Sequence, residues 1–198
     1  LFLPQDRTET LMSQRLNDLG GEVLFGRRLV GLDGRGPVTV RFEHGMEATF
    51  DHVIGADGVQ STVRQAAGIA FSGYDLDQMW SIADIEATGW RHPADFTVSL
   101  LPRGIAVVVP VASGRYRLVA SSADALAALA LPMNVSRVRR TGTFRISVRQ
   151  AETYRAGGVV LAGDAAHTHS PVGGRGMNTG IADAAVLASF RERIRGIL

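Results

Sequence analysis

Alternation between apolar and polar positions divides the chain into segments of different period, and each period predicts an element. Residues 4–21 carry apolar side chains at helical spacing, with Asp6 and Glu9 arranged as a capping box and Gly20 as a stop. Short alternating runs follow, separated by turn residues, and predict an antiparallel meander. These runs are residues 22–25, 28–32, 38–42 and 47–50.

The rest of the chain begins and ends with strand–helix pairs. The apolar run 52–55 breaks at Gly55 and predicts a buried strand, and residues 59–69 have the spacing of a short helix. The chain closes with a predicted strand at 157–164 and a predicted helix at 176–198. Between these pairs, strand-like runs predict a mostly antiparallel sheet that includes one short helix, residues 123–132. The predicted strands of this sheet are residues 79–87, 96–102, 104–111, 116–122 and 141–148.

The two ends of the chain are thus α/β in character, and the middle is rich in strands. This order predicts an α/β (α+β) fold in which one domain is discontinuous. Residues 1–70 and 151–198 would form the α/β domain, and residues 71–150 a β-sheet domain inserted between its two parts.

Composition and charge narrow the class of protein. Apolar residues make up 45% of the 198 residues, which is enough for a packed core. No apolar run is long enough to span a bilayer, and no leader is visible, so we expect no membrane association. With no cysteine there is no disulfide, and a cytoplasmic location is the simplest expectation. The pI of about 9.6 arises because every basic residue is arginine, and these are scattered, which disfavours nucleic acid as a partner.

The stretch LAGDAAHTHSPVGGRGMNTGIADAA, residues 161–185, carries most of the candidate chemistry. Asp164, His167 and His169 are side chains of the kind that bind metals. The surrounding glycines and proline oppose the strand on which an H-x-H pair chelates, so we expect no metal site. An ordinary strand-to-helix loop is the alternative, but it does not explain the glycines that crowd a helix start, namely Gly173, Gly174, Gly176 and Gly180.

Glycines at a helix N-terminus let a ligand approach exposed backbone N–H groups, which favour negative charge. Asp164 follows a predicted strand, where α/β sheets place ligand contacts, and its carboxylate can accept hydrogen bonds from sugar hydroxyls. A second Gly-Asp turn places Asp57 after the strand at 52–55. Its alternative interpretation is a turn aspartate that caps the next helix.

These segments resemble the FAD-dependent aromatic hydroxylases, the group A flavoprotein monooxygenases similar to p-hydroxybenzoate and phenol hydroxylases. GADGVQSTVR, residues 55–64, resembles their DG motif, and LAGDAAHTHSPVGGRGMNTGIADA, residues 161–184, resembles their GD motif and flavin loop. LPQDRTE, residues 3–9, and LPRGIAVVVPV, residues 101–111, are similar to further segments of the family. The resemblance covers nearly the whole chain in order.

The resemblance implies that residues 1–70 and 151–198 are part of a Rossmann-like FAD-binding domain and that residues 71–150 are its substrate domain. Asp164 would bind the ribityl chain of FAD, and Asp57 would lie near the pyrophosphate and affect NAD(P)H use. Gln5 would touch the ribityl side. The remaining cofactor-binding residues would border the isoalloxazine ring or face its N1/O2 edge with their N–H groups: Pro171, Gly173, Gly174, Gly176, Met177 and Asn178.

The activity that this family implies is FAD- and NAD(P)H-dependent hydroxylation of a small aromatic substrate, phenolic or polycyclic, by O₂ through a flavin C4a-hydroperoxide. No side chain is an obvious catalytic acid or base, and a homodimer is compatible with the sequence. The GxGxxG motif that opens the family's FAD domain is absent, and the chain starts at Leu1. These departures indicate a piece of a longer enzyme and leave two alternatives: a truncated non-catalytic remnant, or another flavoenzyme of this fold, a dehydrogenase or epoxidase.

Overall fold

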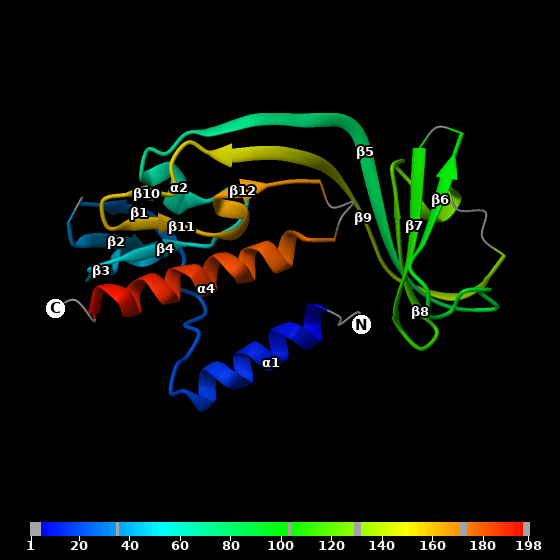
Figure 1. Ribbon diagram of the computed structural model, residues 1–198, viewed down its shortest axis with the longest axis horizontal. Coiled ribbons are helices and arrows are strands. Elements are labelled where there is room, and N and C mark those ends of the chain that lie inside the picture. The colour runs from blue at the N-terminus through cyan, green and yellow to red at the C-terminus, as the bar shows by residue number, and fades with distance from the viewer. Residues whose placement is uncertain (1–4, 35, 103, 129–131, 171–173, 196–198) are drawn as a thin grey trace. The chain divides into compact units, whose positions relative to one another are not determined.

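The computed structural model describes residues 5–34, 36–102, 104–128, 132–170 and 174–195, with side chains up to residue 189. The chain divides into two compact units (Figure 1). The first, here called the sheet unit, comprises Leu1–Leu24 and Leu76–Ile146. The second, here called the motif unit, comprises Phe25–Asp75 and Ser147–Leu198. Each unit is described by itself.

The motif unit begins with the predicted meander. Strands β1 (Leu29–Asp33), β2 (Val38–Phe42) and β3 (Glu47–Phe50) form an antiparallel sheet in the order β1-β2-β3, and the short 3₁₀ helix η1 (Glu43–Gly45) makes the second turn. The strand predicted at 22–25 is wrong: residues 22–24 have no regular structure. Its apolar alternation comes from exposed side chains, since Phe25 is 89% exposed.

A second, smaller sheet carries the sequence motifs. Strand β4 (Val53–Gly55) pairs in parallel with β11 (Val159–Leu161), and β10 (Arg155–Ala156) adds an antiparallel edge. Gly55 lies where β4 meets the helix α2 (Thr62–Ala66), because a Cβ there would lie within 2.9 Å of both Val63 and Leu161 side chains. The predicted strands at 52–55 and 157–164 and the short helix between 59 and 69 are thus confirmed.

The core of the motif unit joins these parts. Val38 and Val40 of β2, Val63 of α2 and Val159 and Leu161 of β11 are all buried in one cluster. Burial of apolar side chains from the meander, from α2 and from the parallel pair therefore fixes the strand ends on which the motifs lie.

The GD segment folds as two short elements and one long helix of the motif unit. The 3₁₀ helix η2 (Gly163–Ala165) follows β11, and β12 (His167–Thr168) pairs antiparallel with the end of β9 (Asn134–Ala151). Helix α4 (Gly176–Arg195) confirms the predicted C-terminal helix and contacts η2. Figure 1 shows α4 as the long orange-to-red helix.

The sheet unit is a mostly antiparallel sheet, as predicted. Strand β5 (Phe71–Thr88), which like β9 contributes to both units, pairs with β8 (Arg115–Ala120). Beyond β8 lie β7 (Gly104–Ala112) and the edge strand β6 (Thr97–Leu101), in the order β9-β5-β8-β7-β6. Alternate residues of β5, β7 and β8 form the core of this unit, together with Ala125 of the short helix α3 (Ala125–Ala128).

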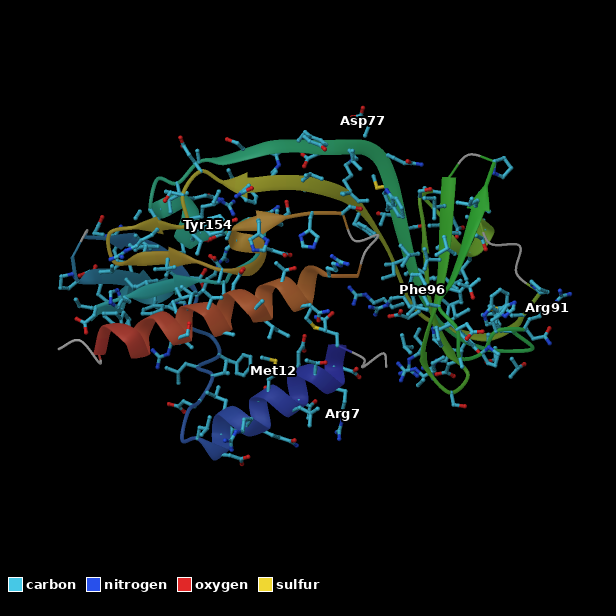
Figure 2. The ribbon with its side chains drawn as sticks, viewed as in Figure 1. Arg7, Met12, Asp77, Arg91, Phe96 and Tyr154 are labelled. Atoms are coloured by element: carbon cyan, nitrogen blue, oxygen red, sulfur yellow. The ribbon has the colours of Figure 1, made fainter. Side chains whose placement is uncertain are left out.

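Helix α1 (Gln5–Asp18) confirms the first predicted helix but corrects its start. The helix already includes Gln5, so Asp6 lies in its first turn rather than at the cap, and Glu9 accepts a hydrogen bond from the Gln5 side chain. None of its residues is buried; Figure 2 labels Arg7 and Met12 on this helix, and Met12 is exposed. Gly20 adopts the positive φ of a helix stop, as expected.

The two compact units and the two predicted domains have different boundaries. The contacts place residues 1–24 with the sheet, whereas the predicted α/β domain of residues 1–70 and 151–198 included them. The assignment of cofactor binding to that domain and of substrate binding to residues 71–150 stays a prediction. No helix in the described part of the chain is both long and apolar enough to cross a membrane.

Candidate functional site

The structure brings the two Gly-Asp turns to the same edge of one sheet. In the parallel pair, Leu161 of β11 lies opposite Gly55 of β4, and the Ala162 N–H donates to the Gly55 carbonyl at 2.9 Å. Asp57 follows β4 by two residues, and Asp164 follows β11 by three. The carboxyl ends of parallel strands are where α/β folds place ligand contacts, and both motifs lie at this edge of the sheet.

Asp57 is tied into the start of α2. Its carboxylate accepts a hydrogen bond from the Ser61 hydroxyl and another from the Val63 N–H at 3.1 Å. Ser61, the N-cap residue, in turn accepts from the Arg64 N–H at 2.9 Å. The capping role that the sequence left open for Asp57 is therefore real. A role in cofactor binding stays a prediction beside it, because the carboxylate has further acceptor capacity.

Arg64 links the two motifs, and sequence analysis missed it. Its side chain is buried and donates to the Val59 carbonyl at 2.7 Å and to the Ala165 carbonyl at 2.9 Å. Its guanidinium also lies 3.8 Å from the centre of the Phe71 ring. Burial lowers the pKa of Arg64 from its ordinary value, against the raising influence of Asp57. The available signal was an arginine three residues after a serine N-cap, among apolar positions.

Asp164 is the exposed residue of a loop whose other residues are buried or hydrogen-bonded to neighbouring segments. Ala165 and Ala166 are buried, and the Ala166 carbonyl accepts from the Ala151 N–H at 2.7 Å. The Asp164 side chain is exposed and makes no hydrogen bond or ion pair with any residue that the structure describes. A carboxylate presented from a fixed loop without a protein partner can accept hydrogen bonds from a ligand.

Asp183 of α4 holds the same loop from the other side. Its Oδ2 accepts from the Gly163 N–H at 2.8 Å and lies 2.7 Å from the His167 Nε2. One helical turn earlier, Gly180 packs against Gly163, so that a Cβ on Gly180 would lie 3.5 Å from the Gly163 Cα. His167 is thus engaged by the Asp183 carboxylate through its Nε2 atom. Sequence analysis missed Asp183, although it is the single acidic residue in GIADAAVLASF.

The N-terminus of α4 presents the remaining predicted residues. The helix starts at Gly176, Met177 and Asn178 are exposed in its first turn, and the Thr179 N–H bonds to the Arg175 carbonyl. N–H groups of a first turn have no partner within the helix, which makes this end suited to negative charge. Gly174 has φ +60° and no atom within 4 Å of a built Cβ.

The structure does not bring the other three predicted residues into this group. Pro171 and Gly173 lie outside the described residues. Gln5 is exposed on α1, in the sheet unit, whereas Asp57, Asp164 and the start of α4 belong to the motif unit. A cofactor contact by Gln5 therefore stays a prediction.

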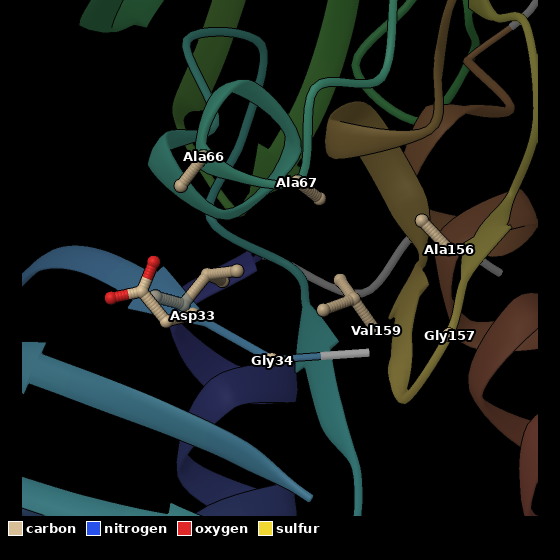
Figure 3. A pocket seen from close by; sticks show the side chains of 8 residues that line it. Asp33, Gly34, Ala66, Ala67, Ala156, Gly157 and Val159 are labelled. Atoms are coloured by element: carbon tan, nitrogen blue, oxygen red, sulfur yellow. The ribbon is translucent and has the colours of Figure 1, made fainter. Parts of the chain in front are cut away.

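Two of the pockets among the described residues open on the motif unit, and neither of these is lined by a predicted cofactor residue. One of about 460 Å³ lies between the end of β1, α2 and the turn from β10 to β11, and Figure 3 shows its small side chains with Asp33 as the labelled acid. The other, of about 540 Å³, is lined by β9, β12 and α4 and includes His167, His169 and Asp183. Tyr154, labelled in Figure 2, also lines it, with its ring centre 6.1 Å from that of His167.

Among the described residues, no group of three or more histidine, cysteine or acidic side chains could hold a metal ion. His167 and His169 have ring centres 6.3 Å apart and stack obliquely.

Comparison with known proteins gives a consistent family. The family model described as an FAD binding domain matches residues 1–126 and 119–190. Rifampicin monooxygenase of Streptomyces venezuelae is 35% identical over 207 residues, covering 93% of this chain and 43% of that protein. An uncharacterized aromatic compound monooxygenase of Bacillus subtilis is 31% identical over 208 residues, covering 93% and 41%.

A solved structure agrees with the sequence relatives. The anhydrotetracycline hydroxylase OxyS from Streptomyces rimosus superposes with a TM-score of 0.75 at 33% identity, covering 93% of this chain and 41% of that one. The chain thus spans about two-fifths of the length of the proteins that it matches. With the family model covering most of its residues, the chain belongs to the FAD binding domain family, and its relatives include a monooxygenase and a hydroxylase.

Proposed function

We propose that the protein containing this chain is an FAD- and NAD(P)H-dependent monooxygenase that hydroxylates an aromatic substrate. The observation that carries the proposal is the exposed side chain of Asp164, which has no partner among the described residues. It stands on a loop that is bonded to α4 through Asp183. Relatives that include an anhydrotetracycline hydroxylase and an aromatic compound monooxygenase support the reaction class.

The residues present fit the flavin end of FAD. A ribityl chain offers hydroxyl donors, and the free Asp164 carboxylate is an acceptor for them. Gly174 leaves open space where a side chain would stand, and its φ of +60° is a conformation that other residues rarely adopt. Asp57, already committed to α2 through Oδ1 and Oδ2, would contribute its remaining acceptor positions near the pyrophosphate.

The first turn of α4 would tune the cofactor. When bound, the flavin supplies the redox and oxygen chemistry, which no side chain of the protein can provide. The backbone N–H groups of Met177 and Asn178 have no partner within the helix and would stabilise negative charge at the N1/O2 edge of the ring. No described side chain is assigned as a catalytic acid or base.

Residues 71–150, most of which lie in the sheet unit, are the proposed substrate domain. On the face of its sheet opposite the core, Asp84 of β5 and Arg117 of β8 form a bidentate ion pair, with 2.7 Å and 2.9 Å between donor and acceptor atoms. Apolar Ile82 and Val119 lie opposite each other one step along the same face and are only half-buried. A face with apolar side chains beside a fixed charge pair suits an aromatic ring that bears a polar group.

A single preparation tests this function. The full-length protein should purify with a flavin absorbance band and should oxidise NADH or NADPH faster when a phenol is added. Incorporation of one ¹⁸O atom from ¹⁸O₂ into the product identifies a monooxygenase. Flavin without oxygen incorporation would indicate a dehydrogenase instead, and epoxide product an epoxidase. Absence of flavin binding by the full-length protein would contradict the proposal.

A further inference from the structure

Asp183 connects two parts of the proposed cofactor site that lie far apart in the sequence. One Oδ2 atom accepts from the Gly163 N–H at 2.8 Å and contacts the His167 Nε2 at 2.7 Å. Gly163 directly precedes Asp164, and His167 begins β12 just after the loop. A single carboxylate oxygen on α4 therefore holds both ends of the loop that presents Asp164.

The same carboxylate ties the loop to a point about two turns into α4. Asp183 lies seven residues after Gly176, which is about two helical turns. Gly180, one turn closer to the N-terminus, packs directly on Gly163, with only 3.5 Å between its built Cβ and the Gly163 Cα. Since a helix is stiff over two turns, contacts at positions 180 and 183 also set the position of the N–H groups of the first turn relative to Asp164.

Other hydrogen bonds also hold the loop, but they do not set the position of α4 relative to it. Arg64 bonds to the Ala165 carbonyl, and the Ala151 N–H bonds to the Ala166 carbonyl. Neither reaches the helix. Among the described side chains, the Asp183 carboxylate is the one recorded as bonding from α4 to the loop.

We propose that Asp183 is a positioning residue for flavin binding: its carboxylate holds the Gly163–His167 loop and α4 in the register that sets Asp164 against the N-terminus of the helix. The proposal rests on the proposed FAD-binding function. Asp183 acts through Asp164 and the first turn of α4 and is not itself a ligand of the cofactor. Its loss therefore separates two contacts that FAD needs at the same time.

The test uses apoprotein of the full-length enzyme titrated with FAD. Asp183→Ala should bind FAD about ten- to a hundredfold more weakly, because a charge-assisted anchor is lost. Asp183→Asn keeps an oxygen that can accept from the Gly163 N–H and should bind within about threefold of wild type. Ser189→Ala, which removes an exposed hydroxyl further along α4, is the matched control and should change nothing.

Two further readouts separate positioning from general stability. Flavin still bound to Asp183→Ala at saturating FAD should show a shifted visible absorbance spectrum, since the helix N-terminus no longer meets the ring in the same place. Combined with Asp164→Ala, the Asp183→Ala change should cost little more than Asp164→Ala alone, because residues that act as one unit are not additive.

The outcomes are distinct. Wild-type protein that binds no FAD contradicts the proposed function, whereas normal FAD affinity and spectrum in folded Asp183→Ala contradict the positioning role alone. If Asp183→Ala does not fold, His167→Ala decides. It removes one of the two loop contacts of Asp183 and should weaken FAD binding several-fold, and an unchanged affinity in this variant overturns the proposal.

Discussion

The Arg64 guanidinium donates to the Ala165 carbonyl at 2.9 Å and so joins two motifs that are 101 residues apart in the sequence. The same side chain bonds to the Val59 carbonyl inside its own motif, and its charge lies over the Phe71 ring. A buried cation with two carbonyl acceptors and an aromatic face is stabilised mainly by fixed dipoles. Through these contacts, Arg64 connects the turn that carries Asp57 with the turn that carries Asp164.

Replacing Arg64 should destabilise the protein. Arg64→Met keeps the length of the side chain but leaves two carbonyls without a donor, and we expect a loss of about 2–4 kcal/mol in the free energy of unfolding. Arg64→Lys keeps the charge, but an ammonium group cannot reach both carbonyls as a planar guanidinium does. The free energy of unfolding of Arg64→Lys should therefore lie between those of wild type and Arg64→Met. Urea unfolding followed by circular dichroism measures both.

The control for Arg64 is an arginine on the surface. Arg41 pairs with Asp33, and both side chains are exposed. Arg41→Met should therefore change the free energy of unfolding by only about 0–1 kcal/mol. Equal losses for Arg41→Met and Arg64→Met would show that burial and the two carbonyl contacts do not matter.

Asp164→Ala should weaken FAD binding by about 1.5–3 kcal/mol, roughly ten- to a hundredfold, because an ionised acceptor is lost. Its side chain makes no bond to any described residue, so folding stability should stay within about 0.5 kcal/mol. Titration of full-length apoprotein with FAD gives the first quantity and thermal unfolding the second. Asp51→Ala, an exposed acid of the same unit, should leave both unchanged. An unaltered dissociation constant in Asp164→Ala would remove that residue from the site.

Most helices and strands could be predicted because period and turn chemistry act locally. The alternation in Val38–Phe42 and the turn residues around it define β2 within the meander, and the stop at Gly20 ends α1 where expected. The strand predicted at 22–25 failed because its alternating side chains find no partner in the structure. Alternation predicts a strand only where one of its faces is buried.

The motif loops could be located from the sequence, but the contacts between them could not. Residue type and spacing are enough to identify Asp57, Asp164 and the glycines in the sequence. Arg64 and Asp183 are ordinary charged residues within helices, and their partners are a backbone carbonyl and a backbone N–H on another element. Backbone groups carry no sequence signature, so such bonds become visible only when the fold brings the elements together.

Substitution of Gly174 should lower flavin binding, and this effect can be separated from its effect on folding stability. Its φ of +60° strains any side chain, although a built Cβ meets no atom within 4 Å. Gly26 is a matched control, since it has φ +72° and equally open surroundings. Both Gly174→Val and Gly26→Val should cost about 1–2 kcal/mol of stability through backbone strain. Only Gly174→Val should also lower flavin occupancy, read from the absorbance of the purified full-length protein. A similar occupancy in the two variants would favour an ordinary loop at Gly174.

The histidines of the loop should not bind metal. His167 is bonded to Asp183, and the described residues contain no group of three ligands. Elemental analysis of protein purified without added metal should find no stoichiometric zinc or iron. One equivalent of metal that disappears in His167→Ala would contradict this prediction and the flavin site together.

Acid stability should depend on the Asp84–Arg117 pair of the sheet unit. The hydrogen bonds from Arg117 hold the pKa of Asp84 below its ordinary value, against the raising effect of burial, and the same pair raises the pKa of Arg117. A carboxyl group whose folded pKa is depressed contributes stability that is complete above its unfolded pKa of about 3.9. That contribution is lost as the pH falls from there through the lower folded pKa.

Asp84→Asn should therefore lower the free energy of unfolding by about 1–2 kcal/mol at pH 7, because the bidentate pair becomes a weaker neutral contact. The deficit should shrink as the pH is lowered below about 4, since wild type then protonates Asp84 and loses the same interaction. Urea unfolding at a series of pH values from 7 to 3 measures the difference. Asp77→Asn is the matched control: Asp77 lies on the same strand, is exposed, and is labelled in Figure 2. Its substitution should leave the pH profile unchanged. A deficit in Asp84→Asn that stays constant down to pH 3 would mean that the pair does not depress the pKa of Asp84.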